Sequence, residues 1–279
     1  MKNINKITLH DGRELDWSTP LVMGVINRTP DSFYAGSRTT LEDVAGQAAH
    51  MISEGASIID VGGYSSRPGA EDISPEEEKK RLIPSISVIK ERYPSAVISA
   101  DTFRAEVAYE AIRAGASIIN DISGGQLDDE MDDLIAEEGL PYIVMHMRGT
   151  PQTMKGLTTY EDLLEEVKQF LHNRRKNLHE KGVSQIIFDP GLGFAKTIDQ
   201  NYALLRNLAY FQDNETPLMI GLSRKSMIYN VLGNTAEEAL NGTTALHALA
   251  LHNGANILRV HDVREAKEVI TLYKRYQHS

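Results

Sequence analysis

Polar side chains follow almost every short aliphatic run in this sequence, at the point where the run ends. Asn27 closes the run LVMGVIN, Asp101 closes VISAD and Asp189 closes QIIFD. The other run ends carry Asn120 and Asp121, His146 and Arg148, Ser223, Arg224 and Lys225, and Arg259 and His261. Buried polar groups without partners cost free energy, so these residues would not stabilise a hydrophobic core. These positions are therefore candidates for a binding or catalytic site.

The candidate residues fall into two chemical groups. The first group, Arg67, Lys225, Arg259 and His261, consists of donors suited to phosphate oxygens or to another anion. The second group, Asp101, Asn120 and Asp189, offers carboxylates and an amide, which suit a flat heterocycle rich in N–H donors. Together the two groups predict a site for a phosphorylated ring compound.

The sequence offers little for a transition metal or for covalent catalysis. It contains no Cys, no cluster with three His, Asp or Glu ligands, and no Ser-His-Asp arrangement. A hard cation such as Mg²⁺, held by one Asn oxygen and by substrate phosphates, fits the residues better. What remains is transfer chemistry driven by a phosphate leaving group.

Eight aliphatic runs alternate with amphipathic helical stretches and must position these side chains. The runs are Val22–Asn27, Ser57–Gly63, Val97–Thr102, Ser117–Ile122, Tyr142–Met147, Gln185–Asp189, Pro217–Ser223 and Ile257–Asp262. The helical stretches are 41–54, 76–92, 104–114, 129–138, 160–181, 199–211, 224–232, 242–253 and 263–276. Runs this apolar are buried on both faces, as in a parallel sheet. Eight β-α units in about 250 residues predict an α/β fold of the (β/α)8 TIM barrel type.

Two further features bear on the fold. A doubly wound open sheet is the alternative architecture, but the sequence has no strand followed by a glycine-rich dinucleotide motif. The segment KITLHDGRELDW, residues 6–17, reads as a β-hairpin around Asp11-Gly12. We expect this hairpin to cover the N-terminal mouth of the barrel.

Side-chain alternation points the polar set into the barrel. Arg259 and His261 share one strand face with Ile257, while Leu258 and Val260 can pack against the helices. In barrels of this kind the carboxyl ends of the strands build the active site, and the last two loops commonly bind phosphate. The basic residues of the set lie at those two loops.

Length and charge limit the classes of partner. The 279 residues are expected to form one domain, residues 1–279, and the net charge of −10 disfavours a general surface for nucleic acid or for anionic membranes. The first residues lack an apolar signal core, and no apolar run approaches a membrane span. We expect a cytoplasmic protein that binds small molecules, with no nucleic acid and no membrane as a partner.

Eight segments of the chain also match a known family. In order they are MGVINRTPDSF, IIDVGGYSSRPGA, ISADTFRAEVA, IINDISGG, MHMRGTP, IIFDPGLGFAKT, GLSRKSMI and RVHDVREA. Together they resemble the dihydropteroate synthases of bacterial folate synthesis, from about residue 20 to residue 270. The first two segments are highly specific in combination. The family fold is a (β/α)8 barrel, which agrees with the reading from periodicity.

The resemblance implies a reaction. Dihydropterin-CH2-pyrophosphate loses pyrophosphate, and the amine of p-aminobenzoate attacks the methylene to give dihydropteroate. The family's route is SN1-like, with departure of pyrophosphate before capture of the cation by the amine. The resemblance also implies a homodimer and a target of sulfonamides.

The same resemblance implies a role for each matching residue. Asn27 would hold Mg²⁺, and the expected catalytic residues are Asn27, Arg67, Lys225, Arg259 and His261. The pterin would be bound by Asp101, Asn120, Asp189, Lys225 and Met145, and the pyrophosphate by Asn27, Arg67, Arg259 and His261. The p-aminobenzoate would contact Phe33, Ser66, Arg67, Pro68, Phe194 and Ser223. Ser223 would also cap the N-terminus of the following helix.

The chain departs from the family pattern at three places, one of them the loop tail YAGSR, residues 34–38, where the family usually has an acidic, glycine-rich tail. Arg28 stands where the family usually has Val, and Tyr64-Ser65-Ser66-Arg67 stands where it has Glu-Ser-Thr-Arg. These changes leave the reaction class intact and bear on sulfonamide affinity. Two other functions also compete. A methyltetrahydrofolate-type methyltransferase would share the pterin-binding acids but would not need the basic set. A non-catalytic pterin-binding protein should have lost Asn27 or the basic set.

Overall fold

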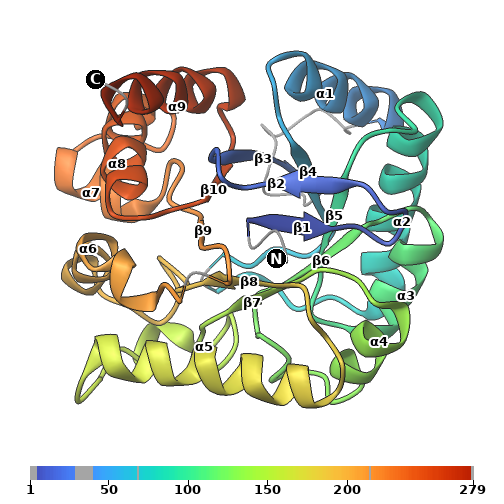
Figure 1. The fold of residues 1–279 in the computed structure, drawn as a ribbon, viewed down its shortest axis with the longest axis horizontal. Helices are drawn as coiled ribbons and strands as arrows, with labels where there is room; N and C mark the ends of the chain where they lie inside the picture. The colour runs from blue at the N-terminus through green and yellow to red at the C-terminus, as the bar shows by residue number, and fades with distance from the viewer. Residues whose placement is uncertain (1–4, 29–39, 68, 214, 278–279) are drawn as a thin grey trace.

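The computed structural model describes residues 5–28, 40–67, 69–213 and 215–277. Within these ranges eight parallel strands form one sheet, namely β3 (Leu21–Asn27), β4 (Ile58–Gly62), β5 (Ile98–Asp101), β6 (Ile118–Asp121), β7 (Tyr142–Met145), β8 (Ile186–Asp189), β9 (Met219–Ile220) and β10 (Ile257–Val260). They pair in the order β8-β7-β6-β5-β4-β3-β10-β9, and a bridge from Phe188 to Leu218 joins the two edges. The predicted barrel is confirmed, with helices around it (Figure 1).

Helices follow the strands along the chain. Their bounds are α1 (Leu41–Ser53), α2 (Pro75–Arg92), α3 (Ala105–Arg113), α4 (Met131–Glu138), α5 (Leu163–Glu180), α6 (Ile198–Arg206), α7 (Ser226–Leu232), α8 (Leu240–His252) and α9 (Val263–Gln277), with short 3-10 turns η2 (Met154–Gly156) and η3 (Leu208–Phe211). The single helix predicted at 199–211 is wrong, because it divides into α6 and η3. Asn207 leaves the helical conformation between them, and its side-chain amide donates to the carbonyl oxygen of Ala203 at 2.8 Å.

The strand predicted at Pro217–Ser223 is also shorter in the structure. Only Met219 and Ile220 pair as a regular strand. The chain then turns toward α7, and Arg224 takes a left-handed conformation with φ of 55°. The polar run end therefore lies in a turn above the sheet rather than in the sheet itself.

The predicted hairpin is present and closes the N-terminal end of the barrel. Strands β1 (Lys6–Thr8) and β2 (Glu14–Asp16) pair antiparallel, with Ile7 opposite Leu15. The buried side chains of Ile7, Leu9 and Trp17 pack on an apolar layer inside the barrel, formed by Leu21, Met23, Ile58, Val97, Ile118, Ile143, Ile187, Met219 and Ile257. Figure 1 shows the hairpin, in dark blue, lying across the ring of strands. This layer fills the lower half of the barrel, so polar residues are confined to the upper half.

A buried histidine outside the barrel gives a testable pH dependence. His247 of α8 is 1% exposed, and neither ring nitrogen has a hydrogen-bond partner in the described ranges. Burial lowers its pKa to about 4. The folded protein therefore keeps His247 neutral while the unfolded chain takes up a proton below about 6.5, so this residue lowers stability as the pH falls from 6.5 toward 4.

We expect His247→Leu to gain stability over the unchanged protein as the pH is lowered. The gain from pH 7.5 to pH 5 should be about 2 kcal/mol, at about 1.4 kcal/mol for each pH unit below 6.5. Urea unfolding of both proteins at the two pH values measures it. Subtracting the free energy of unfolding of one protein from that of the other cancels the contribution of buried carboxylates such as Asp101. That contribution changes with pH in the opposite direction to the contribution of His247. A difference that does not change with pH would contradict the neutral, buried state of His247.

Candidate active site

An ion-paired cluster lies in the upper half of the barrel. Arg259 on β10 donates from Nε to Oδ2 of Asp60 at 2.7 Å, and from Nη2 to Oδ2 of Asp101 at 2.6 Å. Asn120 on β6 donates from Nδ2 to the same oxygen of Asp60 at 3.2 Å. The structure thus brings together three residues that the sequence predicted, around a fourth that it missed.

The missed residue is Asp60, in the middle of β4. Its side chain is fully buried, and Oδ1 has no hydrogen-bond partner in the part of the chain that the structure describes. A buried carboxylate oxygen without a donor is costly, so this acid is not a packing residue. The signal was an acid inside an aliphatic run, on the same strand face as Ile58 and Gly62.

The electrostatics of the cluster favour one cation between two acids. Burial raises the pKa of Asp101 to about 7, although the Arg259 cation works in the opposite direction. Burial disfavours the charged form of Arg259, but Asp60 and Asp101 outweigh it and raise the pKa of the guanidinium. Since Arg259 stays charged and serves both acids, the acids can accept further hydrogen bonds from a ligand.

A third acid and a lysine come from β8 and from the turn before α7. Asp189, at the end of β8, is 5% exposed and accepts from the backbone N–H of Gly191 at 2.7 Å. Burial raises the pKa of Asp189, and burial lowers the pKa of Lys225 to about 8. The positive charge of Lys225 limits the rise in the pKa of Asp189, and the negative charge of Asp189 limits the fall in the pKa of Lys225. Asp189 and Lys225 therefore form an acceptor and a donor at one wall of the site.

Lys225 is held by the loop that follows Asp189. Its Nζ donates to the carbonyl oxygen of Leu192 and lies 4.8 Å from the centre of the Phe194 ring. Phe194 in turn packs on a small apolar cluster that contains Met145, Met147 and the neighbouring residues Ile122, Met154 and Ala195. Met145 is buried at the end of β7. Met145, predicted to contact the pterin, and Phe194, predicted to contact p-aminobenzoate, thus belong to the same apolar cluster.

Lys196 is a second buried residue near the site that the sequence did not predict. Its Nζ donates to Nδ1 of His146 at 3.0 Å and to the carbonyl oxygens of Gly191 and Phe194 at 3.0 and 2.9 Å. Burial lowers its pKa to about 7. The amine therefore joins the end of β7 to the loop that carries Phe194. Nothing in the local pattern of GLGFAKT distinguishes this lysine from an exposed one.

A cavity of about 280 Å³ opens beside the cluster at the carboxyl ends of the strands. It is lined by Val25, Asn27, Gln47, Arg67, Arg224, Ala236, Glu237 and His261. Asn27, Arg67 and His261 are the predicted pyrophosphate-binding residues other than Arg259. Arg224 is fixed in its wall by two hydrogen bonds to Asp262, both 2.8 Å long. Burial lowers the pKa of His261 to about 4, so its ring is neutral and can offer a hydrogen bond but no charge. With two arginines against one acid, Glu237, the cavity is basic on balance, as an anion site requires.

The prediction that Ser223 caps the next helix is wrong. The residue at the N-cap of α7 is Lys225, and its side chain makes no capping hydrogen bond. The left-handed turn at Arg224 separates Ser223 from the helix. The hydroxyl of Ser223 instead accepts from the backbone N–H of His261 at 3.2 Å and lies 3.1 Å from Nδ1 of its ring. Ser223 therefore orients His261.

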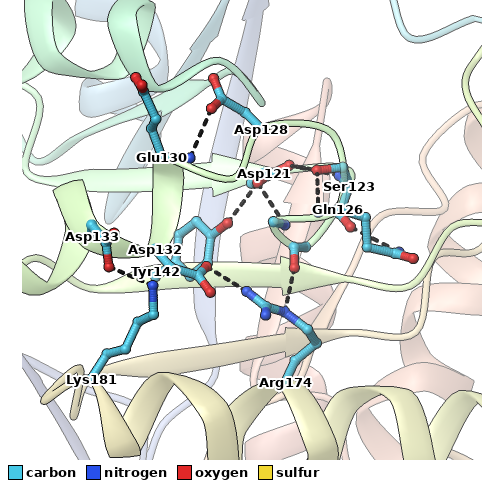
Figure 2. A network of polar contacts seen from close by, with 12 residues as sticks. Asp121, Ser123, Gln126, Asp128, Glu130, Asp132, Asp133, Tyr142, Arg174 and Lys181 are labelled. Atoms are coloured by element: carbon cyan, nitrogen blue, oxygen red, sulfur yellow. Dashed lines mark hydrogen bonds and ion pairs between the residues drawn. The ribbon is translucent and has the colours of Figure 1, made fainter.

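Neighbouring residues at the end of β6 face opposite ways. Asn120 points into the barrel toward Asp60. Asp121 accepts from the backbone N–H and the hydroxyl of Ser123, both at 2.7 Å, and from the hydroxyl of Tyr142 at 2.6 Å (Figure 2). Arg174 of α5 closes the same network by donating to the carbonyl oxygen of Gly124 at 2.6 Å. Asp121 thus secures the turn that follows Asn120 and is not part of the site.

The remaining predicted contacts lie in the loops after β3 and β4. Ser66 is half-buried and Arg67 is exposed. Phe33 and Pro68 lie outside the described residues. Within the described ranges, no group of three His, Asp or Glu side chains could hold a metal ion, and no helix is long and apolar enough to cross a membrane.

Comparisons with known proteins agree on one family. The model of the pterin binding enzyme family matches residues 23–261. The dihydropteroate synthase of Escherichia coli K12 is 42% identical over 262 residues, which cover 93% of this chain and 92% of that protein.

Two solved structures match over nearly the whole chain. The Yersinia pestis dihydropteroate synthase with a sulfonamide drug complex has a TM-score of 0.93 and 36% identity, covering 98% of this chain and 100% of that chain. The Xanthomonas albilineans enzyme with 4-aminobenzoic acid has a TM-score of 0.91 and 35% identity, covering 99% of each chain. This chain belongs to the pterin binding enzyme family, among the dihydropteroate synthases.

Proposed function

We propose that this protein, as one domain, condenses dihydropterin-CH2-pyrophosphate with p-aminobenzoate to give dihydropteroate and pyrophosphate. The observation that carries the proposal is the position of the basic cavity beside the buried acids. Asn27, Arg67 and His261 line the cavity. Arg259, two residues before His261 in the chain, forms ion pairs with Asp60 and Asp101. A compound with a donor-rich ring at one end and pyrophosphate at the other matches this arrangement.

We assign each group of residues to the part of the substrates that its chemistry suits. Asp101, Asn120 and Asp189 accept the N–H donors of the pterin, while Lys225 and Met145 complete its pocket. Arg67, Arg259 and His261 bind the pyrophosphate. Ser66, Arg67, Phe194 and Ser223 contact p-aminobenzoate, together with Phe33 and Pro68. Arg259 serves both halves because it lies against Asp101.

The proposed reaction breaks one bond and then forms one. The C–O bond between the methylene and pyrophosphate breaks, and its electron pair leaves with the pyrophosphate oxygen. The carboxylates of Asp101 and Asp189 stabilise the positive charge that develops on the pterin, and Arg67 and His261 stabilise the charge on the leaving group. The amine nitrogen of p-aminobenzoate then forms the C–N bond and loses a proton to water or to pyrophosphate.

The residues around Asn27 fit Mg²⁺. Its Oδ1 and Oδ2 of Asp101 both lie 3.5 Å from the position that a Cβ on Gly62 would occupy. Asn27 also lines the cavity proposed for pyrophosphate, so its amide oxygen and phosphate oxygens could share a hard cation. Asn27 is the proposed ligand, and Mg²⁺ bound there would neutralise part of the pyrophosphate charge.

Asn27→Ala should weaken the Mg²⁺-dependent binding of the pterin pyrophosphate and reduce turnover by on the order of a hundredfold. Titration of Mg²⁺ into the assay and into a calorimetric binding experiment measures both effects. Asn230→Ala, on the exposed face of α7, is the control. If Asn27→Ala keeps nearly full activity at limiting Mg²⁺, the metal role is wrong.

The test of the function is an assay of the purified protein with the pterin pyrophosphate, p-aminobenzoate and Mg²⁺. Release of pyrophosphate that depends on both the protein and p-aminobenzoate supports the proposal. Methyl transfer from methyltetrahydrofolate without pyrophosphate release would favour the methyltransferase alternative. Pterin binding with neither reaction would favour the non-catalytic one.

We further propose that the protein is a homodimer that pairs through α8 and α9. A groove of about 660 Å³ runs between these helices, which lie side by side in Figure 1. Large apolar side chains are exposed along it, with Leu249 51%, Leu272 72% and Tyr276 69% exposed. Burial of such a surface by a second copy would be favourable, since contiguous apolar patches mark association sites.

Leu272→Glu should convert the dimer to a monomer, because it places a charge in the apolar contact. Sedimentation equilibrium over a range of protein concentrations measures the change. Leu127→Glu, at an exposed apolar residue away from the groove, should leave the dimer intact. A monomeric unchanged protein at high concentration would contradict the proposal.

A further inference from the structure

Tyr64 lies at the centre of a polar network next to the candidate site. It follows β4 and is only 8% exposed. Its hydroxyl donates to Oδ1 of Asp72 at 3.0 Å and accepts from Nε2 of Gln152 at 2.8 Å. Burial raises the pKa of Tyr64, so the hydroxyl keeps the proton that it donates to Asp72. One hydroxyl thus links two ends of a surface loop to a residue far along the chain.

The ring and the far end of the loop are fixed from the other side. The Tyr64 ring meets the Phe103 ring edge to face, with centres 5.1 Å apart. The Arg104 guanidinium lies 5.3 Å from the centre of the Tyr64 ring and donates to Asp72 and to the carbonyl oxygen of Ile73 at 3.1 and 2.7 Å. These contacts hold Tyr64 in one orientation and Asp72 within its reach.

Backbone contacts join the middle of the loop to the segment after β7. The N–H of Gly69 donates to the carbonyl oxygen of Pro151 at 3.1 Å. The Nε2 of Gln152, which serves the Tyr64 hydroxyl, also donates to the carbonyl oxygen of Ala70 at 3.1 Å. Gln152 therefore bonds to the loop at two points, and Tyr64 supplies one of them.

Ser66 and Arg67 lie between these anchors. Arg67 lines the basic cavity with Asn27 and His261. At the start of the loop the chain passes very close to α2, since a Cβ on Gly63 would lie 2.9 Å from the carbonyl oxygen of Glu78. The start of the loop is thus confined at Gly63, and the hydroxyl of Tyr64 ties that start to Asp72 at the end of the loop and to Gln152.

We propose that Tyr64 is a positioning residue for the second substrate. Its hydroxyl, shared between Asp72 and Gln152, holds residues 64–67 and 69–72 against the segment after β7, and so sets the positions of Ser66 and Arg67. The inference rests on the proposed function, because that function gives these two residues to p-aminobenzoate. The acids that bind the pterin lie on other strands, so binding of the pterin ring should not depend on Tyr64. Ser66 transmits the effect to p-aminobenzoate, and Arg67 transmits it to the pyrophosphate as well.

Tyr64→Phe tests the proposal, since it removes the hydroxyl and keeps the ring on Phe103. The KM for p-aminobenzoate should rise about tenfold, as for the loss of one net hydrogen bond that orders the loop. The affinity for a pterin without pyrophosphate should change by less than about twofold, while kcat should fall by a smaller factor than the rise in KM, because Arg67 also stabilises the leaving group. Amide exchange at residues 65–67 and 69–71 should quicken. Tyr109→Phe, on an exposed tyrosine of α3, should change none of these.

A double-mutant cycle with Gln152→Leu sharpens the test. If both residues act through one contact, the double variant should raise the KM for p-aminobenzoate no more than the larger single effect. An unchanged KM and unchanged exchange in Tyr64→Phe would overturn the proposal, as would an equal loss of pterin affinity. If the unchanged protein forms no dihydropteroate, the proposed function fails, and the amide exchange still shows whether Tyr64 holds the loop.

Discussion

Arg259→Met should reduce turnover by on the order of a hundred- to a thousandfold and should also destabilise the fold. Arg259 supplies the cation between Asp60 and Asp101, with hydrogen bonds of 2.7 and 2.6 Å. Its loss removes a fixed charge beside the leaving group. It also leaves two buried acids without a cation, which costs about 3–5 kcal/mol of stability for a broken buried pair.

The two effects of Arg259→Met can be measured separately. Steady-state release of pyrophosphate gives the first, and urea unfolding gives the second. Arg264→Met, at an exposed arginine of α9, is the matched control and should change neither. Adding Asp60→Asn to Arg259→Met should restore part of the stability, because one unpaired charge is then removed, but should not restore turnover. Full turnover in Arg259→Met would show that the cluster does not bind the leaving group.

Asp189→Ala should weaken pterin binding by about 2–5 kcal/mol, since the buried N–H donors of the ring lose their acceptor. The carboxylate stands at the end of β8, 5% exposed, and accepts from the backbone N–H of Gly191. It also faces Lys225, whose pKa burial lowers to about 8. With the acid gone, the pKa of Lys225 should fall further and the lysine should lose charge near neutral pH.

Calorimetry with a pterin that lacks the pyrophosphate isolates this effect from the phosphate contacts. Asp129→Asn, at an exposed acid before α4, serves as the control and should bind the pterin normally. Unchanged affinity in Asp189→Ala would mean that the pterin binds elsewhere in the molecule.

The sequence predicted the structure best where a local pattern of residues directly reflects burial or a turn. Aliphatic runs buried on both faces predict parallel strands. Polar residues lie at or next to most of the run ends, because the carboxyl ends of these strands surround the site. Asn27, Asp101, Asn120, Asp189 and Arg259 could all be found in this way. The hairpin was readable because its alternation and its Asp-Gly turn are both local.

Features that depend on tertiary geometry were missed. Asp60 lies in the middle of β4, and its importance depends on Arg259 reaching it from β10, two strands away in the sheet. That order is set by the pairing of β10 with β3, in which Ile257 from near the end of the chain lies opposite Leu21. Lys196 resembles any loop lysine until His146 and two carbonyl oxygens surround it.

The error at Ser223 has a similar origin. A serine just before a predicted helix is a typical cap, and the sequence gives no sign of the left-handed turn at Arg224. That turn moves the helix start two residues onward and leaves Ser223 against His261. The left-handed backbone conformation of Arg224 thus determines that the Ser223 hydroxyl contacts His261 instead of capping α7.

We propose that the acids in the upper half of the barrel hold the pterin while the adjoining basic cavity holds the pyrophosphate. A crystal structure of the protein with dihydropterin-CH2-pyrophosphate and Mg²⁺ tests it most directly. We expect the N–H donors of the ring to contact Asp101, Asn120 and Asp189, and the pyrophosphate to lie against Asn27, Arg67 and His261. A pterin bound away from these acids, or a pyrophosphate outside the cavity, would contradict it.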